Sequence, residues 1–190
     1  MKRFLLVGKT GVGKSSFVNA SFGVELARCN RYEACTKLAE TYSHGTEYGP
    51  LCLIDTPGLA DDCRETDFKY LKIIREFIAE NPIDTALFLS RLDDTRFRAE
   101  DKETLRLITE QLGSSIWRNA WLVFTFCAEV EMSKLNEAAN ARICEIEDYL
   151  RRVRGNASFT GFNKYILIDN VKVGWHPNAS VITEALCEES

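Results

Sequence analysis

The residues best suited to chemistry form a glycine-rich run near the start of the chain, Gly8-Lys-Thr-Gly-Val-Gly-Lys-Ser15. The spacing lets successive backbone N–H groups curl around an anion, with Lys14 reaching terminal phosphates and the Ser15 hydroxyl available to Mg²⁺. A simple turn needs only one or two glycines and does not explain the Lys-Ser ending. The run therefore predicts a site for the phosphates of a nucleotide.

The residues expected to contact the phosphates come from this run and from the residue that follows it. They are Gly11, Val12, Gly13, Lys14, Ser15 and Ser16. Lys14 is also expected to act in catalysis, because its charge stabilises a phosphoryl group during transfer. The apolar run Phe4–Val7 predicts a strand before the loop, and residues 15–22 predict a helix whose N-terminus faces the phosphates.

A second motif, Asp55-Thr-Pro-Gly58, directly follows the apolar run Leu51–Ile54. A carboxylate at the end of a strand is placed to organise Mg²⁺ through a bound water, and the Gly58 N–H is placed to meet a γ-phosphate. An ordinary Asp-Pro-Gly turn is the plain alternative. In this chain order, after the glycine-rich loop, the motif is typical of P-loop GTPases of the translation-factor and Ras-like class.

A threonine between the two motifs is expected to complete the Mg²⁺ shell when a triphosphate is bound. Thr36 is the best candidate and Thr41 a weaker one. The plain alternative is that Thr36 only begins a strand. The predicted metal ligands are therefore Ser15, Thr36 and Asp55, and Thr36 also counts among the residues expected to act in catalysis.

The stretch from Phe88 to Thr125 narrows the class. It contains Leu89-Ser-Arg-Leu-Asp-Asp-Thr-Arg96, then Asp101 and a predicted helix that ends at Gly113, then Ile116-Trp117 and Trp121-Leu-Val-Phe-Thr125. This arrangement resembles the septin-like GTPases, which include plant chloroplast-import receptors of the Toc type and immunity-associated GTPases of the AIG (GIMAP) type. The glycine-rich loop also has that group's form. The resemblance covers residues 1 to about 170 and does not single out one member.

The resemblance implies a homodimer that forms across the nucleotide faces, with Arg96 close to the partner's nucleotide as a catalytic residue. A solvated arginine at a helix entrance is the alternative for Arg96. Leu59 stands near the place where many small GTPases have a glutamine that orients water. We therefore expect intrinsic hydrolysis at or below roughly 10⁻³ to 10⁻⁴ s⁻¹, unless a partner completes the site.

The base-reading segment departs from the common Asn-Lys-x-Asp form and reads Thr125-Phe-Cys-Ala-Glu129. Relatives in this group also lack the common form. Glu129 is the nearest carboxylate that can accept from guanine, and Phe126 is expected to cover the base. Asn170, in a segment where relatives carry Glu-Asn, is expected on the other side of the base. The alternatives are an exposed loop acid for Glu129 and a turn residue for Asn170.

The elements that must position these residues alternate along the chain. Strands are predicted at Arg3–Val7, Leu51–Ile54, Ala86–Ser90, Ala120–Thr125 and Tyr165–Ile168, and helices at Phe68–Glu80, Arg98–Leu112 and Leu135–Val153. A further strand is possible in Thr36–His44, a loop is expected at 155–163, and a turn with a closing helix at Val173–Ser190. The alternation predicts an α/β fold, a three-layer P-loop NTPase G domain with a mostly parallel sheet and helices on both faces.

Composition limits the remaining choices. With 190 residues, 45% of them hydrophobic, we expect a single G domain over 1–190, with a core over about 1–170 and a short closing segment over 171–190. The net charge of −4 gives no general basic field for nucleic acid. Seven cysteines without metal-binding spacing predict reduced thiols and a cytoplasmic location. No apolar run approaches the roughly 18 residues of a membrane segment.

Together these patterns predict a protein that binds GTP and GDP with Mg²⁺ and hydrolyses GTP slowly. Segments 23–36 and 58–67 are expected to order with triphosphate and relax with diphosphate, so that dimerisation or partner binding is switched. Two alternatives stay open. One is a nucleotide-dependent scaffold that does not hydrolyse GTP, and the other is an NTPase with relaxed base specificity.

Overall fold

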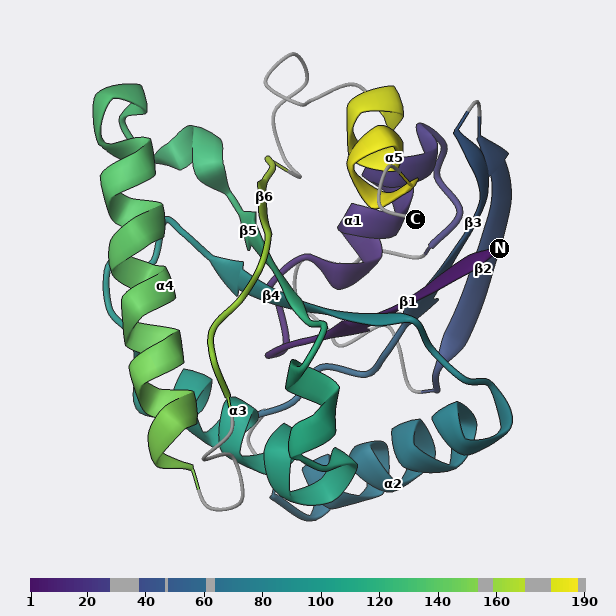
Figure 1. Cartoon of the computed structure of the whole chain (residues 1–190), viewed down its shortest axis with the longest axis horizontal. Helices are drawn as coiled ribbons and strands as arrows, with labels where there is room; N and C mark the ends of the chain where they lie inside the picture. The colour runs from purple at the N-terminus through teal and green to yellow at the C-terminus, as the bar shows by residue number, and fades with distance from the viewer. Residues whose placement is uncertain (28–37, 47, 61–63, 154–158, 170–178, 188–190) are drawn as a thin grey trace.

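The computed structural model describes residues 1–27, 38–46, 48–60, 64–153, 159–169 and 179–187. Within these residues one six-stranded sheet runs in the order β2-β3-β1-β4-β5-β6 (Figure 1). Its strands are β1 (Lys2–Val7), β2 (Glu40–Thr46), β3 (Gly49–Asp55), β4 (Thr85–Arg91), β5 (Trp121–Thr125) and β6 (Tyr165–Leu167).

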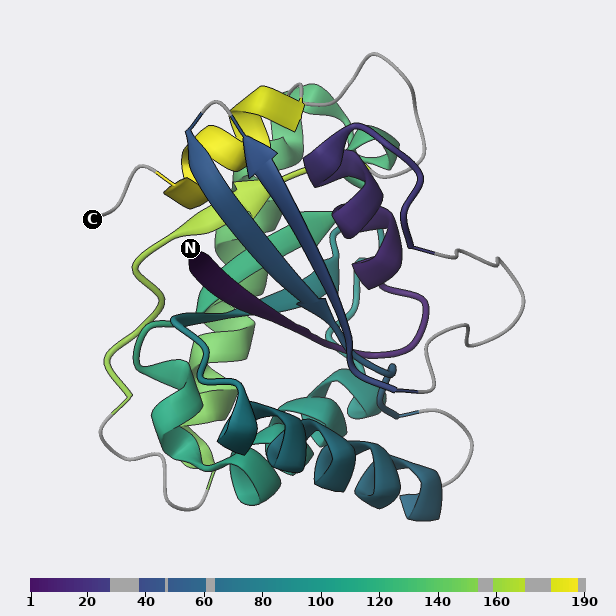
Figure 2. The ribbon, with the colours of Figure 1, turned by 90° about the vertical axis from the view of Figure 1, so that its right-hand side faces the viewer.

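The sheet is mostly parallel, as predicted. Strand β1 lies between β3 and β4 and is parallel to both, and β4, β5 and β6 continue in the same direction. Only β2 among these strands runs antiparallel, and its hairpin with β3 forms one edge of the sheet (Figure 2). The possible strand within Thr36–His44 is thus found at Glu40–Thr46, and Thr36 itself lies outside the described residues.

Helices cover both faces of the sheet. They are α1 (Lys14–Phe22), α2 (Arg64–Glu80), α3 (Ala99–Leu112), α4 (Leu135–Arg152) and α5 (Ala179–Cys187), with short 3-10 turns η1 (Ser114–Trp117), η2 (Cys127–Glu129) and η3 (Met132–Lys134). Helices α1 and α5 pack together on one face, while α2, α3 and α4 lie on the other (Figure 1). This is the three-layer arrangement expected from the alternation of strands and helices.

The hydrophobic core is split by the sheet into two halves. Leu5 and Val7 of β1 join the cluster under α2, α3 and α4, whereas Phe4 and Leu6 join the cluster under α1 and α5. Successive side chains of a strand point to opposite faces, so a central strand covered on both sides must be apolar throughout. This is why the central strands could be predicted as continuous apolar runs.

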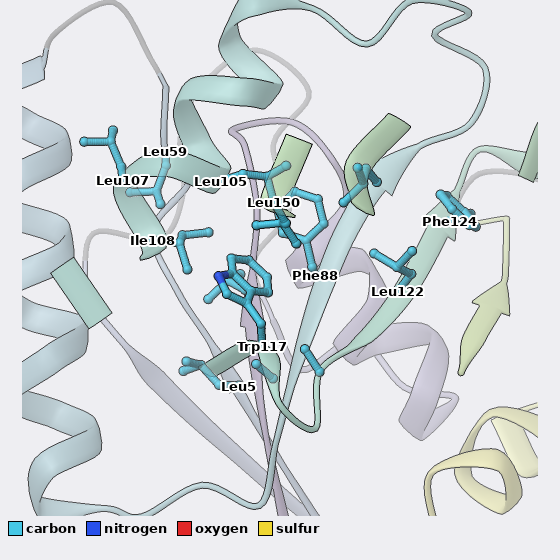
Figure 3. Packing of buried hydrophobic residues seen from close by; sticks show 14 of the residues in the cluster. Leu5, Leu59, Phe88, Leu105, Leu107, Ile108, Trp117, Leu122, Phe124 and Leu150 are labelled. Carbon is cyan, nitrogen blue, oxygen red and sulfur yellow. The ribbon is translucent and has the colours of Figure 1, made fainter. Parts of the chain in front are cut away.

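The larger half of the core is centred on Trp117, which is buried at the end of η1 (Figure 3). Its ring meets Phe88 edge-on at 5.8 Å, and its Nε1 donates a hydrogen bond of 2.8 Å to Thr109 Oγ1. A buried indole is stabilised when its N–H finds such a partner. Trp117 therefore fixes α3 against β4.

The carboxyl ends of the parallel strands meet at one edge of the sheet. The segments that follow β1, β3, β4, β5 and β6 begin at residues 8, 56, 92, 126 and 168. In open α/β sheets, ligands bind outside this edge. The motifs predicted from the sequence, far apart along the chain, are thereby placed on the same side of the molecule.

Candidate functional site

The glycine-rich loop joins β1 directly to α1. Gly13 is the N-cap of α1, with φ of 91°, a left-handed conformation that glycine adopts without strain. Glycine has no side chain with which to cap the first turn. A helix N-terminus of this kind is suited to an anion, because its N–H groups and the helix dipole both favour negative charge.

The neighbours of Gly13 reach the loop in different ways. Val12 is buried with its side chain in the core under α1, so it faces the loop through its backbone. Gly11 lies exposed at the tip with φ of 77°, and Ser16 lies in the first turn of α1. The structure thus brings the predicted phosphate contacts into one loop and one helix turn.

Lys14 lies folded across the loop. Its side chain is buried, and Nζ donates hydrogen bonds of 3.1 Å to the carbonyl oxygens of both Gly8 and Lys9. Burial lowers the pKa of Lys14 from 10.5 to about 8, an effect that the nearby Asp55 carboxylate partly offsets. A buried ammonium whose hydrogen bonds here go to carbonyl oxygens is poised to pair with an anion such as a phosphate.

The second motif contacts the glycine-rich run through the hydroxyl group of Ser15. Ser15 Oγ donates a hydrogen bond of 2.6 Å to Asp55 Oδ2, and Asp55 is buried at the end of β3. Hydroxyl and carboxylate oxygens are ligands that Mg²⁺ takes, and Mg²⁺ sites in nucleotide-binding proteins use only one or two carboxylates besides phosphate and water. The residues present therefore fit Mg²⁺, while Thr36, the third expected ligand, lies outside the described residues.

The loop after β3 is closed onto the glycine-rich loop. Thr10 N–H donates to Leu59 O at 3.0 Å, and Leu59 N–H donates to Gly8 O at 3.2 Å. A Cβ atom on Gly58 would lie 2.3 Å from Thr10 Oγ1 and 2.5 Å from Thr10 Cα. Only glycine fits at position 58 in this arrangement, because the two backbones touch there.

Leu59 points away from the site and into the core. It is 1% exposed and belongs to the cluster that also contains Leu107 and Ile108 (Figure 3). The next residue, Ala60, has φ of 56°, and its N–H donates to the buried carboxylate of Asp67 at 3.0 Å. Asp67 therefore anchors the start of the segment that follows the second motif, a role that the sequence did not indicate.

The base-side segment follows β5. Thr125 Oγ1 donates to Val12 O at 2.9 Å, so the end of β5 is tied to the glycine-rich loop. Phe126 has φ of 57°, and the Arg91 guanidinium lies 3.9 Å from its ring centroid. The predicted cover for the base thus has one ring face against Arg91.

Glu129 and the segment after β6 lie close to this region. Glu129 is exposed at the end of η2, and Cys127 N–H donates to Ile168 O at 3.2 Å. This hydrogen bond brings Asp169, which is buried, beside the Thr125–Glu129 segment. Asn170, the residue predicted to contact the base, lies outside the described residues.

Arg96 lies exposed on the segment between β4 and α3. Its backbone N–H donates to Asp94 Oδ1 at 3.3 Å, and Asp94 also pairs with Arg98 at 2.9 Å. Burial alone raises the pKa of Asp94, but the hydrogen bonds from Arg98 and Arg96 outweigh it and hold that pKa below its ordinary value. The segment is therefore organised around a charged Asp94 while the Arg96 side chain faces solvent.

Two charged residues, Asp101 and Arg142, connect the segment between β4 and α3 to its neighbours at the carboxyl edge of the sheet. Asp101, near the start of α3, pairs with Lys9 of the glycine-rich loop at 2.9 Å and accepts the Arg98 N–H at 2.9 Å. Arg142 of α4 is buried and donates to Ser90 Oγ at 3.2 Å. The sequence contains a sign that Arg142 is unusual, because this charged residue interrupts an apolar stripe of α4. The stripe is formed by Leu135, Ala139, Ile146 and Leu150.

The chain is similar in sequence to one family of GTP-binding proteins. Residues 2–162 match the AIG1 family model. GTP-binding protein A of Dictyostelium discoideum is 36% identical over 127 residues, which cover 66% of this chain and 28% of the relative. Translocase of chloroplast 90 of Arabidopsis thaliana is 29% identical over 177 residues, which cover 88% of this chain and 22% of the relative. The chain thus spans less than a third of the length of these curated relatives.

Solved structures of chloroplast translocon components share the fold. A dimerisation-deficient mutant of Toc33 from Arabidopsis thaliana has a TM-score of 0.75 at 25% identity, covering 89% of this chain and 70% of its own. Toc33 with Mg²⁺ and GMPPNP has a TM-score of 0.72 at 24% identity and the same coverage. A structure of atToc33 and psToc159, for which dimerisation is described as important for GTPase activity, has a TM-score of 0.79 at 23% identity, covering 98% and 82%.

Among the helices that the structure describes, none is both long enough and apolar enough to cross a bilayer.

Proposed function

The chain belongs to the AIG1 family, and from this premise we propose that it binds GTP and GDP with Mg²⁺, hydrolyses GTP slowly and acts as a switch under the control of dimerisation or a partner. The observation that carries the proposal is the 2.6 Å hydrogen bond between Ser15 and Asp55 beside the buried Lys14. These groups come from both motifs and form one site for phosphate and a divalent cation.

In this proposal Lys14 leaves the carbonyl oxygens of Gly8 and Lys9 and pairs with the terminal phosphates, together with N–H groups of Gly11–Ser16. Ser15 and Asp55 would hold Mg²⁺, directly or through water, with Thr36 as the third protein ligand. When bound, Mg²⁺ offsets the negative charge that develops on the phosphate oxygens. The Gly58 N–H would meet the γ-phosphate, which makes the loop after β3 sensitive to its presence.

Slow hydrolysis follows from the place of Leu59, whose side chain is part of the core and has no group that orients water. Arg96 is exposed and is proposed to supply charge at the nucleotide of a second copy of the chain, as a catalytic residue acting across a homodimer. An arginine that reaches a phosphoryl-transfer site in trans is worth about 10³ to 10⁵ in rate. The described importance of dimerisation for the GTPase activity of atToc33 and psToc159 supports this arrangement.

Guanine is proposed as the base because of Glu129, whose exposed carboxylate lies on the segment tied to the glycine-rich loop through Thr125. Phe126 would contact the base with the ring face that Arg91 does not cover, and Asn170 would contact it from the other side. We further propose that residues 1–190 act as one G domain and that the protein works in the cytoplasm, where its cysteines stay reduced.

A specific observation favours a second candidate, a scaffold that binds GTP without turning it over. Leu59 occupies the core, so a single copy of the chain offers no residue at that position to activate water. Exposed Arg96 favours the enzyme instead, because it can complete the site of a partner.

The experiment that tests the proposal measures phosphate release from GTP with excess Mg²⁺ and with a chelator present. The wild type is compared with Lys14→Ala and with Lys72→Ala, a control on the exposed surface of α2. Mg²⁺-dependent release that Lys14→Ala abolishes and Lys72→Ala retains supports the enzyme. Tight GTP binding with no release at any protein concentration supports the scaffold and contradicts the enzyme.

A further inference from the structure

Arg142 is a buried charged residue that the proposed nucleotide chemistry does not use. It lies in the middle of α4 and is 5% exposed. Its Nη1 donates to Ser90 Oγ at 3.2 Å and to Arg91 O at 3.1 Å, and its Nη2 donates to Asp94 O. Ser90 and Arg91 are the last two residues of β4, and Asp94 lies in the segment that follows it.

These contacts need an arginine and not merely a positive charge. The guanidinium is planar and carries its donors in a fixed fork, so that it can hold several acceptors of one turn at once. Its Nε is 3.2 Å from Glu145, whose side chain is about half exposed, and its Cζ lies 5.9 Å from the Phe97 ring centroid. The charge is therefore compensated mainly by the hydrogen bonds to residues 90–94.

Asp94 connects Arg142 to Arg96. The backbone carbonyl of Asp94 accepts from Arg142, while its carboxylate accepts the Arg96 N–H and pairs with Arg98. One residue thus receives a hydrogen bond from α4 through its backbone and orients the backbone of Arg96 through its side chain. The position of Arg96 depends in this way on a helix that lies about fifty positions further along the chain.

We propose that Arg142 is a positioning residue that fixes the turn after β4 so that Arg96 faces outward toward the nucleotide of a second copy of the chain. The inference rests on the proposed function, in which Arg96 acts across the dimer. It adds the residue on which the reach of Arg96 depends, and this residue is itself buried within the chain.

Helix α4 does not need Arg142 in order to dock. Its buried stripe of Leu135, Ala139, Ile146 and Leu150 packs into the larger half of the core. Burial of these apolar side chains stabilises the packing of α4 against the sheet. Arg142→Met takes a donor away from the acceptors on Ser90, Arg91 and Asp94, so some loss of stability is expected. The apolar stripe stays intact in this variant and keeps α4 docked, and folding is checked by circular dichroism.

The test measures GTP turnover per molecule against protein concentration for Arg142→Met and Arg142→Lys, each made with Arg96 present and with Arg96→Ala. GDP affinity is measured in parallel. Arg151→Ala, near the exposed end of α4, serves as the matched control. We expect Arg142→Met to reduce the concentration-dependent rise in turnover about tenfold or more, since small misplacements of a catalytic group have effects of this size.

GDP affinity of Arg142→Met should stay near the wild-type value, and the substitution should cause no further loss when Arg96 is already alanine. Arg142→Lys, whose ammonium lacks the fork that holds Arg91 O and Asp94 O together, should lose most of the rise as well and gives the same reading if the methionine variant does not fold. Arg151→Ala should behave like the wild type.

The inference is overturned if turnover of Arg142→Met rises with protein concentration as much as that of the wild type. It is also overturned if Arg142→Met causes the same loss of turnover in the Arg96→Ala background, or a loss of GDP affinity as large as its loss of turnover. If turnover of the single variant Arg96→Ala still rises with protein concentration, the proposed role of Arg96 across the dimer is contradicted, and the inference fails with it. Because Arg96→Ala is measured by itself, the two failures are distinguishable.

Discussion

The hydroxyl of Ser15 donates a hydrogen bond of 2.6 Å to Oδ2 of Asp55. Ser15 lies in the first turn of α1 and Asp55 ends β3, so this bond joins two motifs that are separate in the sequence. In the proposed function these two oxygens hold the cation beside the phosphates.

Asp55→Asn keeps the size of the side chain but removes its negative charge. We expect Mg²⁺ to stop strengthening GTP binding in this variant, with a loss of about tenfold or more in the effect of the metal. A fluorescent GTP analogue titrated with Mg²⁺ and with a chelator measures it. Asp84→Asn, exposed before β4, is the control and should respond like the wild type. An unchanged response to Mg²⁺ in Asp55→Asn would place the cation elsewhere.

Nucleotide binding should take up a proton at alkaline pH. Burial lowers the pKa of Lys14 to about 8, so the nucleotide-free protein loses this charge as the pH rises through 8. Phosphate favours the charged form and raises the pKa again, so affinity for GDP should fall as pH rises, approaching tenfold per unit above 8. Calorimetry at pH 8.5 in buffers of different ionisation enthalpy measures the uptake.

The control for this titration is the substitution Lys14→Arg, because a guanidinium stays charged throughout this range. Any nucleotide binding that the variant retains should therefore vary little between pH 7 and 9. Equal pH dependence in the two proteins would assign the titration to another group.

Gly58→Ala should separate the two loops. The new Cβ would lie 2.3 Å from Thr10 Oγ1 and 2.5 Å from Thr10 Cα, so the backbones must move. Overpacking of this kind costs about 1 to 3 kcal/mol, and the preference for GTP over GDP should shrink. Gly45→Ala, where a Cβ meets nothing within 4 Å, is the matched control. Thermal unfolding and nucleotide titration of both variants test this, and identical behaviour would show that the loops are not in contact.

Leu59→Gln should not create a fast GTPase. The side chain lies in the core, so a glutamine there buries an amide and lowers the free energy of unfolding by about 1 to 3 kcal/mol. Turnover of a dilute sample should stay at the wild-type level. Leu38→Gln, at a position that is 60% exposed, should leave stability unchanged. Denaturant unfolding and phosphate release measure both effects. Faster turnover with full stability would mean that residue 59 can reach the nucleotide.

The sequence predicted the parallel strands because they are apolar on both faces, and their ends moved by a residue or two in the structure. The charged residues at the strand ends also belong to the sheet, since Asp55 lies opposite Glu40 and Arg91 lies opposite Thr125, and an apolar pattern does not reveal this. Lys14 and Ser15 could be predicted to share a loop and a helix start because their motif is short and continuous, and Gly58 could be placed near the end of a strand because it follows the apolar run Leu51–Ile54.

Other features depend on contacts between distant residues, which a single sequence does not specify. The hydrogen bond from Thr125 to Val12 spans 113 positions, and the contact of Arg142 with Ser90 spans 52. The Arg91 guanidinium on Phe126 likewise arises only when β4 and β5 lie side by side. Thr36 and Asn170 stay predictions, because they lie outside the described residues.

The most direct test of the central claim is GTP turnover per molecule measured across a range of protein concentrations, with Mg²⁺ in excess. The wild type is compared with Arg96→Ala and with Arg118→Ala, an exposed arginine before β5 at the opposite end of the sheet. We predict turnover that rises with concentration in the wild type and in Arg118→Ala and stays low in Arg96→Ala. Turnover independent of concentration, or equal in Arg96→Ala and the wild type, would contradict the account.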